Sequence, residues 1–185
     1  MPKALYTLIL AGLFTLNFNA QIYKAKEGTT NITFFSAAPL EDITATNKGG
    51  IIVYNSVTNE IQIRVSVISF KFKNSLMEEH FNENYMETEK FPNAMFKGKI
   101  NEAVDLTKDG ETKITVTGKM EIHGETKEET YEGTITKKGN ELTIKTKFKI
   151  KIVDYKIKVP SMYVKNIAEV VDVDVYSVLE PFQKK

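Results

Sequence analysis

The chain has 185 residues, a length typical of one domain, and its composition of 42% hydrophobic and 26% charged residues is that of an ordinary globular protein. Its 25 basic and 24 acidic residues nearly balance, so it lacks the basic field that nucleic-acid binding requires. It has no cysteine, which excludes disulfides, thiolate chemistry and cysteine-bound metals.

The first 20 residues have the pattern of a secretory signal peptide, with Lys3 as the basic start, an apolar run over 4–18 and Ala20 as the small residue before the cut. The apolar run has about 15 residues, fewer than the roughly 20 that span a bilayer, which favours cleavage over an uncleaved anchor. We therefore expect an exported protein, periplasmic or secreted, that has no membrane span after cleavage and forms one domain over 21–185.

The first part of the mature chain predicts short strands. Apolar side chains alternate over 31–36 and 40–45, and a third apolar run follows at 51–54. Turn-forming residues at 47–50 and 55–59 separate the later runs. A period of two predicts strands with one buried face.

A longer strand is predicted from Glu60 onward. Its apolar residues occupy odd positions over 61–67 and even positions over 68–72. This change of phase predicts a β-bulge near Val67 and Ile68 that bends one continuous strand.

A short helix is predicted next. Ser75 and Glu78 have the spacing of a capping box, and Phe91-Pro92 cannot continue a helix. Spacings of three and four residues place one apolar face on this helix. That face carries Met77, His80, Phe81 and Tyr85.

The rest of the chain predicts five more strands, at 95–104, 113–123, 125–136, 142–152 and 168–179. Within the first of them, Gly98 indicates a bend or a close approach. Along 142–152, lysines alternate with apolar residues. This row favours a solvated outer face, which also discourages edge pairing, over a surface that binds anions.

These elements predict an all-β, antiparallel domain, because eight to ten strands with one helix show no βαβ alternation. Bulges and glycine kinks are how strands turn the corners of a barrel, so we favour a barrel of about eight strands over a sandwich. The interior of such a barrel is wide enough either to be filled by side chains or to hold one small ligand.

Signals for catalysis are weak. His80 and His123 are the only histidines, and their spacing is not that of a zinc pair. The sequence has no nucleophile elbow and no phosphate-binding loop. We therefore expect no metal, no cofactor and no enzymatic activity, with a hydrolase as the less favoured alternative, since a triad assembles in space.

Two groups of residues resemble the YceI-like family over essentially the whole mature chain. His80-Phe81, Tyr85-Met86, Lys90-Phe91-Pro92 and Phe96 are similar to the family's His-Leu, Phe-Phe and Tyr-Pro run. Gly118, Ile122, His123, Gly124 and Thr126 resemble its Gly-x-Leu-Thr-Ile-His-Gly-x-Thr strand end. The resemblance implies an exported, extended, lipocalin-like barrel, and some members hold a polyisoprenoid chain in an apolar tunnel.

We therefore expect a non-enzymatic protein that holds one long apolar ligand, an isoprenoid or another lipid, inside the barrel by burial alone. A structural or partner-binding secreted domain with a filled core is the main alternative. The oligomeric state is left open, with a homodimer as one alternative. The candidate ligand-binding residues are Phe34, Ile63, Val65, Phe70, Phe72, Met77, His80, Phe81, Phe96, Ile114, Val116, Phe148 and Ile150.

Overall fold

The computed structural model describes residues 21–37, 42–159 and 168–182, so the expected signal peptide lies outside the described residues. The elements in chain order are β1 (Ile22–Ala25), β2 (Asn31–Ser36), β3 (Ile43–Asn47), β4 (Ile51–Asn55), β5 (Glu60–Ser66), β6 (Lys71–Phe72), α1 (Ser75–His80), β7 (Asn93–Ile100), β8 (Gly110–Ile122), β9 (Glu125–Lys138), β10 (Glu141–Lys151) and β11 (Val170–Pro181).

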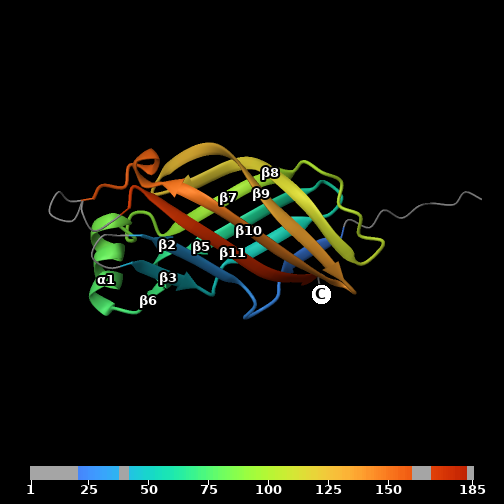
Figure 1. Ribbon diagram of the computed structural model, residues 1–185, viewed down its shortest axis with the longest axis horizontal. Coiled ribbons are helices and arrows are strands. Elements are labelled where there is room, and N and C mark those ends of the chain that lie inside the picture. Colours follow the sequence, from blue (N-terminus) through green and yellow to red (C-terminus); the bar gives the residue numbers. More distant parts are fainter. Residues whose placement is uncertain (1–20, 38–41, 160–167, 183–185) are drawn as a thin grey trace, which may run out of the picture.

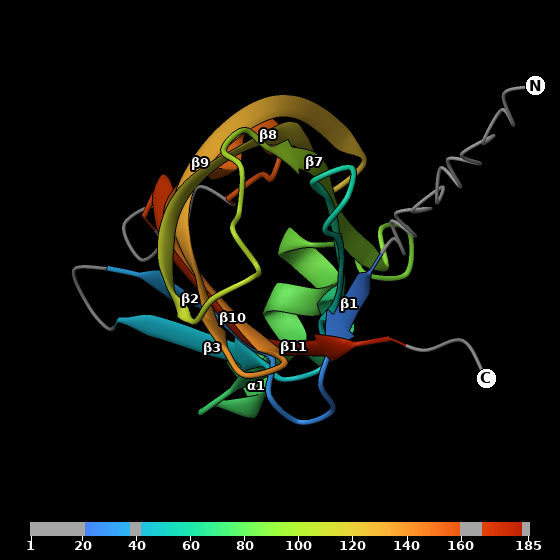
Figure 2. The same cartoon turned by 90° about the vertical axis from the view of Figure 1, so that its right-hand side faces the viewer.

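All strand pairs are antiparallel, and they close into a ring. The order is β1-β4-β5-β7-β8-β9-β10-β11, with β11 returning to β1, while β2, β3 and β6 continue from the other half of β11. Figure 2 shows the strands curving into this ring, with α1 visible through it.

Three pairs of short strands each form one interrupted wall strand. The three pairs are β1 with β2, β3 with β4, and β5 with β6. In one half of the wall β11 pairs with β1, β1 with β4, and β4 with β5. In the other half β11 pairs with β2, β2 with β3, and β3 with β6. The wall is therefore an eight-stranded barrel in chain order with one short helix. This confirms the predicted all-β, antiparallel, lipocalin-like fold.

The interruptions lie side by side across the wall, at 26–30, 48–50 and 67–70, and we call them the kink belt. Buried Asn47 stabilises it, because its Nδ2 donates to the carbonyl of Ser66 at 2.8 Å and its Oδ1 accepts from the amide of Gly49 at 2.8 Å. The hydroxyls of Thr30 and Ser177 share a buried hydrogen bond of 2.9 Å. These bonds satisfy polar groups where the strand ladders stop.

The half of the barrel on the far side of the kink belt from α1 is filled with buried apolar side chains. Tyr54, Ile52, Leu142 and Leu179 are fully buried there, and Ile135 is 1% exposed. The helix α1 covers the opposite end, at the left in Figure 1. The barrel therefore has a closed half and a half that is covered by a helix.

The predicted β-bulge at Val67 and Ile68 is wrong. The chain forms a 3-10 turn, Val67–Ser69, in which the Val67 amide donates to the carbonyl of Pro92, and β6 then pairs with β3. The change of phase is real, but it marks the kink between two strands. Sequence alone does not distinguish a bulge from a turn, because the distinction depends on which strand lies opposite.

The predicted capping box is also wrong. The Oδ1 of Asn74 accepts from the Leu76 amide at 2.9 Å, so Asn74 is the N-cap of α1. The Glu78 carboxylate instead pairs with Lys71 and accepts from the Phe72 amide. These bonds lower the pKa of Glu78, with the Lys71 hydrogen bond as the largest cause, and they tie α1 to β6.

The lysine row on β10 is a solvated outer face, as predicted. Lys147 and Lys149 are exposed and bond to Asp174 and Asp172 on β11, at 2.9 and 2.6 Å. The apolar residues between them point inward.

Candidate functional site

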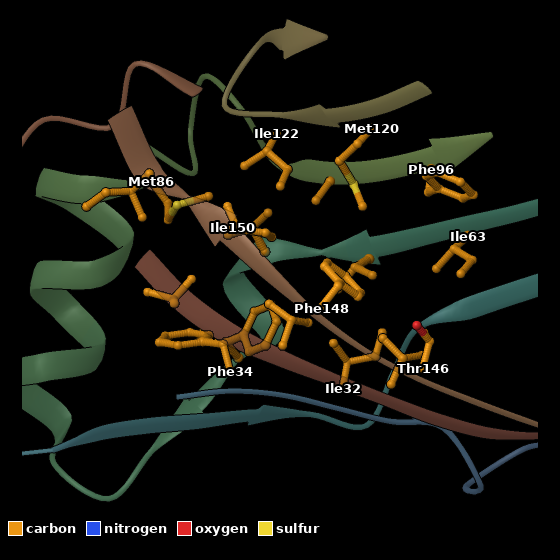
Figure 3. Close-up of a pocket in the computed structure, with 18 of the residues that line it drawn as sticks. Ile32, Phe34, Ile63, Met86, Phe96, Met120, Ile122, Thr146, Phe148 and Ile150 are labelled. Carbon is orange, nitrogen blue, oxygen red and sulfur yellow. The ribbon is translucent and has the colours of Figure 1, made fainter. Parts of the chain in front are cut away.

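The half of the barrel under α1 encloses a cavity of about 540 Å³. This volume lies within the range of about 300–1,000 Å³ that is usual for sites of small molecules. Figure 3 shows side chains from several strands, such as Ile63, Phe96 and Phe148, pointing into it. The polar residues of its lining are Ser36, Asn74, His80, Glu132, Lys145 and Thr146.

Every residue that was proposed from the sequence as ligand-binding lines this cavity, and their contact with a ligand stays a prediction. The strands contribute Phe34 (β2), Ile63 and Val65 (β5), Phe72 (β6), Phe96 (β7), Ile114 and Val116 (β8), and Phe148 and Ile150 (β10). Phe70 directly follows the 3-10 turn Val67–Ser69, and the helical segment contributes Met77, His80 and Phe81.

Several other lining residues were not proposed. Met120 and Ile122 of β8 and the inward valines of β11 show the same period of two, so alternation alone could have found them. Tyr131 of β9 lies in a more polar strand. Met86 follows a π-helical turn, Phe81–Tyr85, which has no period that sequence analysis detects.

The cavity reaches the surface beside α1, and we call this end the mouth. Leu76 of α1 lines the cavity and is still 54% exposed. An apolar side chain in contact with both solvent and an apolar cavity marks a route between them.

An aromatic cluster holds the helical segment over the mouth. The ring of Phe81 lies 5.0 Å from that of Phe72, 5.4 Å from that of Phe34 and 5.9 Å from that of Phe70, centroid to centroid. Such spacings are those of favourable aromatic pairs. Phe81 therefore joins the segment after α1 to β2, β6 and the kink belt.

The wall is incomplete between β9 and β10. Their ladder stops at the pair of Gly133 and Thr146, where the Thr146 hydroxyl donates to the Glu132 carbonyl at 2.6 Å. Beyond this point the rings of Tyr131 and Phe148 pack across the gap, with centroids 4.2 Å apart. Side chains thus replace backbone pairing along this part of the cavity wall.

Tyr155 is buried in a 3-10 turn, Ile152–Tyr155, that contacts β9. Burial raises the pKa of Tyr155 to about 12 and also raises that of Tyr131. Both phenols therefore stay neutral at physiological pH. Tyr131 lines the cavity, whereas Tyr155 lies outside its lining.

Only one of the two histidines belongs to the cavity lining. His80 lines the cavity, whereas His123 lies outside the lining and contacts Glu87 and the Tyr155 carbonyl. Over the described ranges, no group of three or more His, Cys, Asp or Glu residues could hold a metal ion. No helix in the part of the chain that the structure describes is both long and apolar enough to cross a membrane.

An eight-stranded antiparallel barrel around an apolar cavity is the architecture of lipocalin-like ligand-binding proteins. The chain belongs to the YceI-like family, because the family model for the YceI-like domain matches residues 23–179. This confirms the resemblance drawn from the sequence. No curated protein matches the chain.

Solved structures share the fold at low identity. A polyisoprenoid binding domain from Saccharophagus degradans, implicated in plant cell wall breakdown, matches with a TM-score of 0.75 at 14% identity, over 86% of this chain and 98% of the other. BcnA of Burkholderia cenocepacia matches with a TM-score of 0.69 at 16% identity, over 83% and 98%. The YCEI protein of Campylobacter jejuni matches with a TM-score of 0.53 at 15% identity, over 98% and 100%.

Proposed function

We propose that the protein holds one long apolar molecule, an isoprenoid or another lipid tail, inside the barrel without catalysing a reaction. The observation that carries the proposal is the partial exposure of apolar side chains that point into the barrel. Ile63, Phe148 and Ile150 point into the barrel and are nevertheless only half-buried, because they face the cavity. Their apolar surface is what a hydrocarbon would cover.

Burial alone supplies enough free energy for this function. A tail that hides roughly 300 Å² of apolar surface gains on the order of 7 kcal/mol before the costs of association. The polyisoprenoid binding domain from Saccharophagus degradans has the same fold, which supports a ligand of that class. The cavity of about 540 Å³ argues against the alternative of a filled core.

We also propose that the protein works outside the cytoplasm, in the periplasm or as a secreted protein. The support is the sequence over 1–20, with its basic start, its short apolar run and the small residue Ala20. N-terminal sequencing of the protein from its own host tests this, and a chain that retains residues 1–20 would contradict it.

The test of binding is native mass spectrometry of the protein from its own host, followed by organic extraction. We expect an adduct that the extraction identifies as an apolar lipid. The variant Ile63→Trp places a large ring in the cavity and should lose the adduct. Gln62→Trp is the matched control, because Gln62 is the exposed neighbour on the same strand. Bare protein with no extractable lipid would overturn the proposal.

A further inference from the structure

The gap between β9 and β10 connects the cavity with solvent at a second place. Glu132 and Lys145 precede the last residue pair of the ladder, Gly133 and Thr146, on their two strands. Both side chains are exposed, and both residues nevertheless line the cavity. Exposed residues of a barrel strand line the interior only where the wall beside them is open. The cavity is therefore open at this gap as well as at the mouth.

A hollow on the outer face of the wall meets the cavity at the gap. The residues that line it include Lys113, Thr134, Lys145 and Tyr176, which the strand register places in one row across β8, β9, β10 and β11. Glu132, Gly133 and Thr146 line both the hollow and the cavity. The interior is thus continuous with a polar hollow on the outer face.

The gap and the mouth lie at opposite ends of the cavity. Figure 3 shows Thr146 on the side of the cavity away from the helix, and Phe148 and Ile150 follow it on β10 toward the helix. The four residues of rise from Thr146 to Ile150 span about 13 Å. An extended apolar chain can therefore lie along β10, with one end at the gap and the other at the mouth.

The polar side chains at the two ends differ in their hydrogen bonding. At the mouth, Oδ1 of Asn74 already accepts from the Leu76 amide, and His80 also interacts with another part of the protein. At the gap, the side chains of Glu132 and Lys145 have no hydrogen bond or ion pair with any residue that the structure describes. A lysine ammonium only donates, and an ionised carboxylate only accepts. The gap thus offers a ligand one donor group and one acceptor group.

We propose that the gap binds the polar end of the ligand, that this end is a neutral hydroxyl group, and that the tail runs from it toward the mouth. A hydroxyl both accepts and donates, so it can accept from the Lys145 ammonium and donate to the Glu132 carboxylate. A phosphate or a carboxylate would be attracted by the first side chain and repelled by the second. The inference rests on the proposed function, to which it adds the chemical class of the head group and its place in the barrel.

The test compares two probes with the same isoprenoid tail, farnesol with a hydroxyl and farnesene without one. Their affinities follow from displacement of the fluorescent apolar probe N-phenyl-1-naphthylamine from the mature, delipidated protein. Lys145→Ala and Glu132→Ala should each weaken the binding of farnesol about fivefold, the effect of one hydrogen bond, and leave that of farnesene unchanged. Lys151→Ala is the matched control and should change neither, because Lys151 is an exposed lysine of the same strand outside the cavity lining.

A third probe, farnesoic acid, separates a site for an alcohol from a site for an anion. Its carboxylate only accepts, so Glu132→Ala should strengthen its binding while weakening that of farnesol. The proposal is overturned if Lys145→Ala weakens farnesol and farnesene equally. It is also overturned if Glu132→Ala changes the binding of farnesol and of farnesoic acid in the same direction. Far-UV circular dichroism checks that the variants fold.

Amide NMR spectra of the unmodified mature protein locate the hydroxyl independently of the variants. Replacing bound farnesene by farnesol should shift the amide signals of 132–134 and 145–147 more than those of 74–81. The reverse pattern would place the hydroxyl at the mouth, which overturns the inference and leaves the proposed function standing. A protein that takes up none of the apolar probes would contradict the proposed function, and this inference with it.

Discussion

Gly98 of β7 and Gly118 of β8 lie directly opposite each other in the barrel wall. A Cβ at Gly118 would lie 2.3 Å from the Cα of Gly98 and 2.3 Å from the carbonyl oxygen of Lys97, distances at which no side chain fits. The two backbones meet this closely where the wall curves. The close approach that the sequence predicted at Gly98 is confirmed, and Gly118 is its partner.

Gly118→Ala should therefore destabilise the protein by about 3 kcal/mol, because the atoms that its methyl group meets belong to the backbone and cannot rotate away. Gly49→Ala is the control, since a Cβ there meets only the Asn47 side chain at 3.6 Å. Urea unfolding of both variants measures the difference. Equal losses would show that the wall can spread at this point.

Asn47→Ala should cost about 2 kcal/mol of unfolding free energy, because it leaves the Gly49 amide and the Ser66 carbonyl without their partner inside the kink belt. Asn55→Ala removes a similar side-chain cap, on Val57 and Thr58, in a turn that water can reach. It should cost about 1 kcal/mol or less. Thermal unfolding followed by circular dichroism compares the two, and the prediction fails if Asn55→Ala is the more damaging change.

Phe81→Ala should loosen the mouth, since it removes the ring that contacts Phe34, Phe70 and Phe72. A half-buried ring should cost about 2 kcal/mol, less than the roughly 3–5 kcal/mol of a fully buried one. Release of the fluorescent apolar probe N-phenyl-1-naphthylamine from the cavity, followed by stopped flow, should become faster. Glu83→Ala, on the exposed side of the same turn, should change neither quantity, and faster release from it would count against the cluster as the fastening.

Stability should fall between about pH 10 and about pH 12. Burial raises the pKa of Tyr54 to about 12, and the electrostatic effect of Tyr23 is a second, smaller cause of the same shift. The unfolded chain ionises near pH 10 and the folded one does not, so the phenol's contribution is complete below pH 10 and is lost as the pH rises. Urea midpoints should drop across this window by less in Tyr54→Phe than in the wild type, and an identical drop would contradict the assignment.

The strands that the sequence predicted well are those with one buried face along their whole length. In β5, buried or half-buried Ile61, Ile63 and Val65 alternate with exposed residues, and β8 and β10 follow the same rule. The strand β1 was not predicted, because it has four residues and its one fully buried side chain is Tyr23. A single residue defines no period.

Contacts between distant segments explain the other differences. The sequence predicted a strand over 95–104, but β7 ends at Ile100, because the Glu102 side chain instead accepts from the Thr115 amide of β8. The lining of the cavity followed from strand alternation, since inward residues of a barrel must face its axis. The contact between His123 and Glu87 could not be predicted, because the two residues are 36 positions apart in the sequence.

The kink belt separates the half of the barrel that is filled with buried side chains from the half that contains the cavity. On one side, Leu142, Leu179 and their neighbours are buried, and the pairing of β1 with β11 closes the ring there. Residues on the other side can be exchanged without disturbing that packing. Under the proposed function, the preference for one ligand over another can therefore change during evolution, or be redesigned, while the buried half of the barrel stays intact.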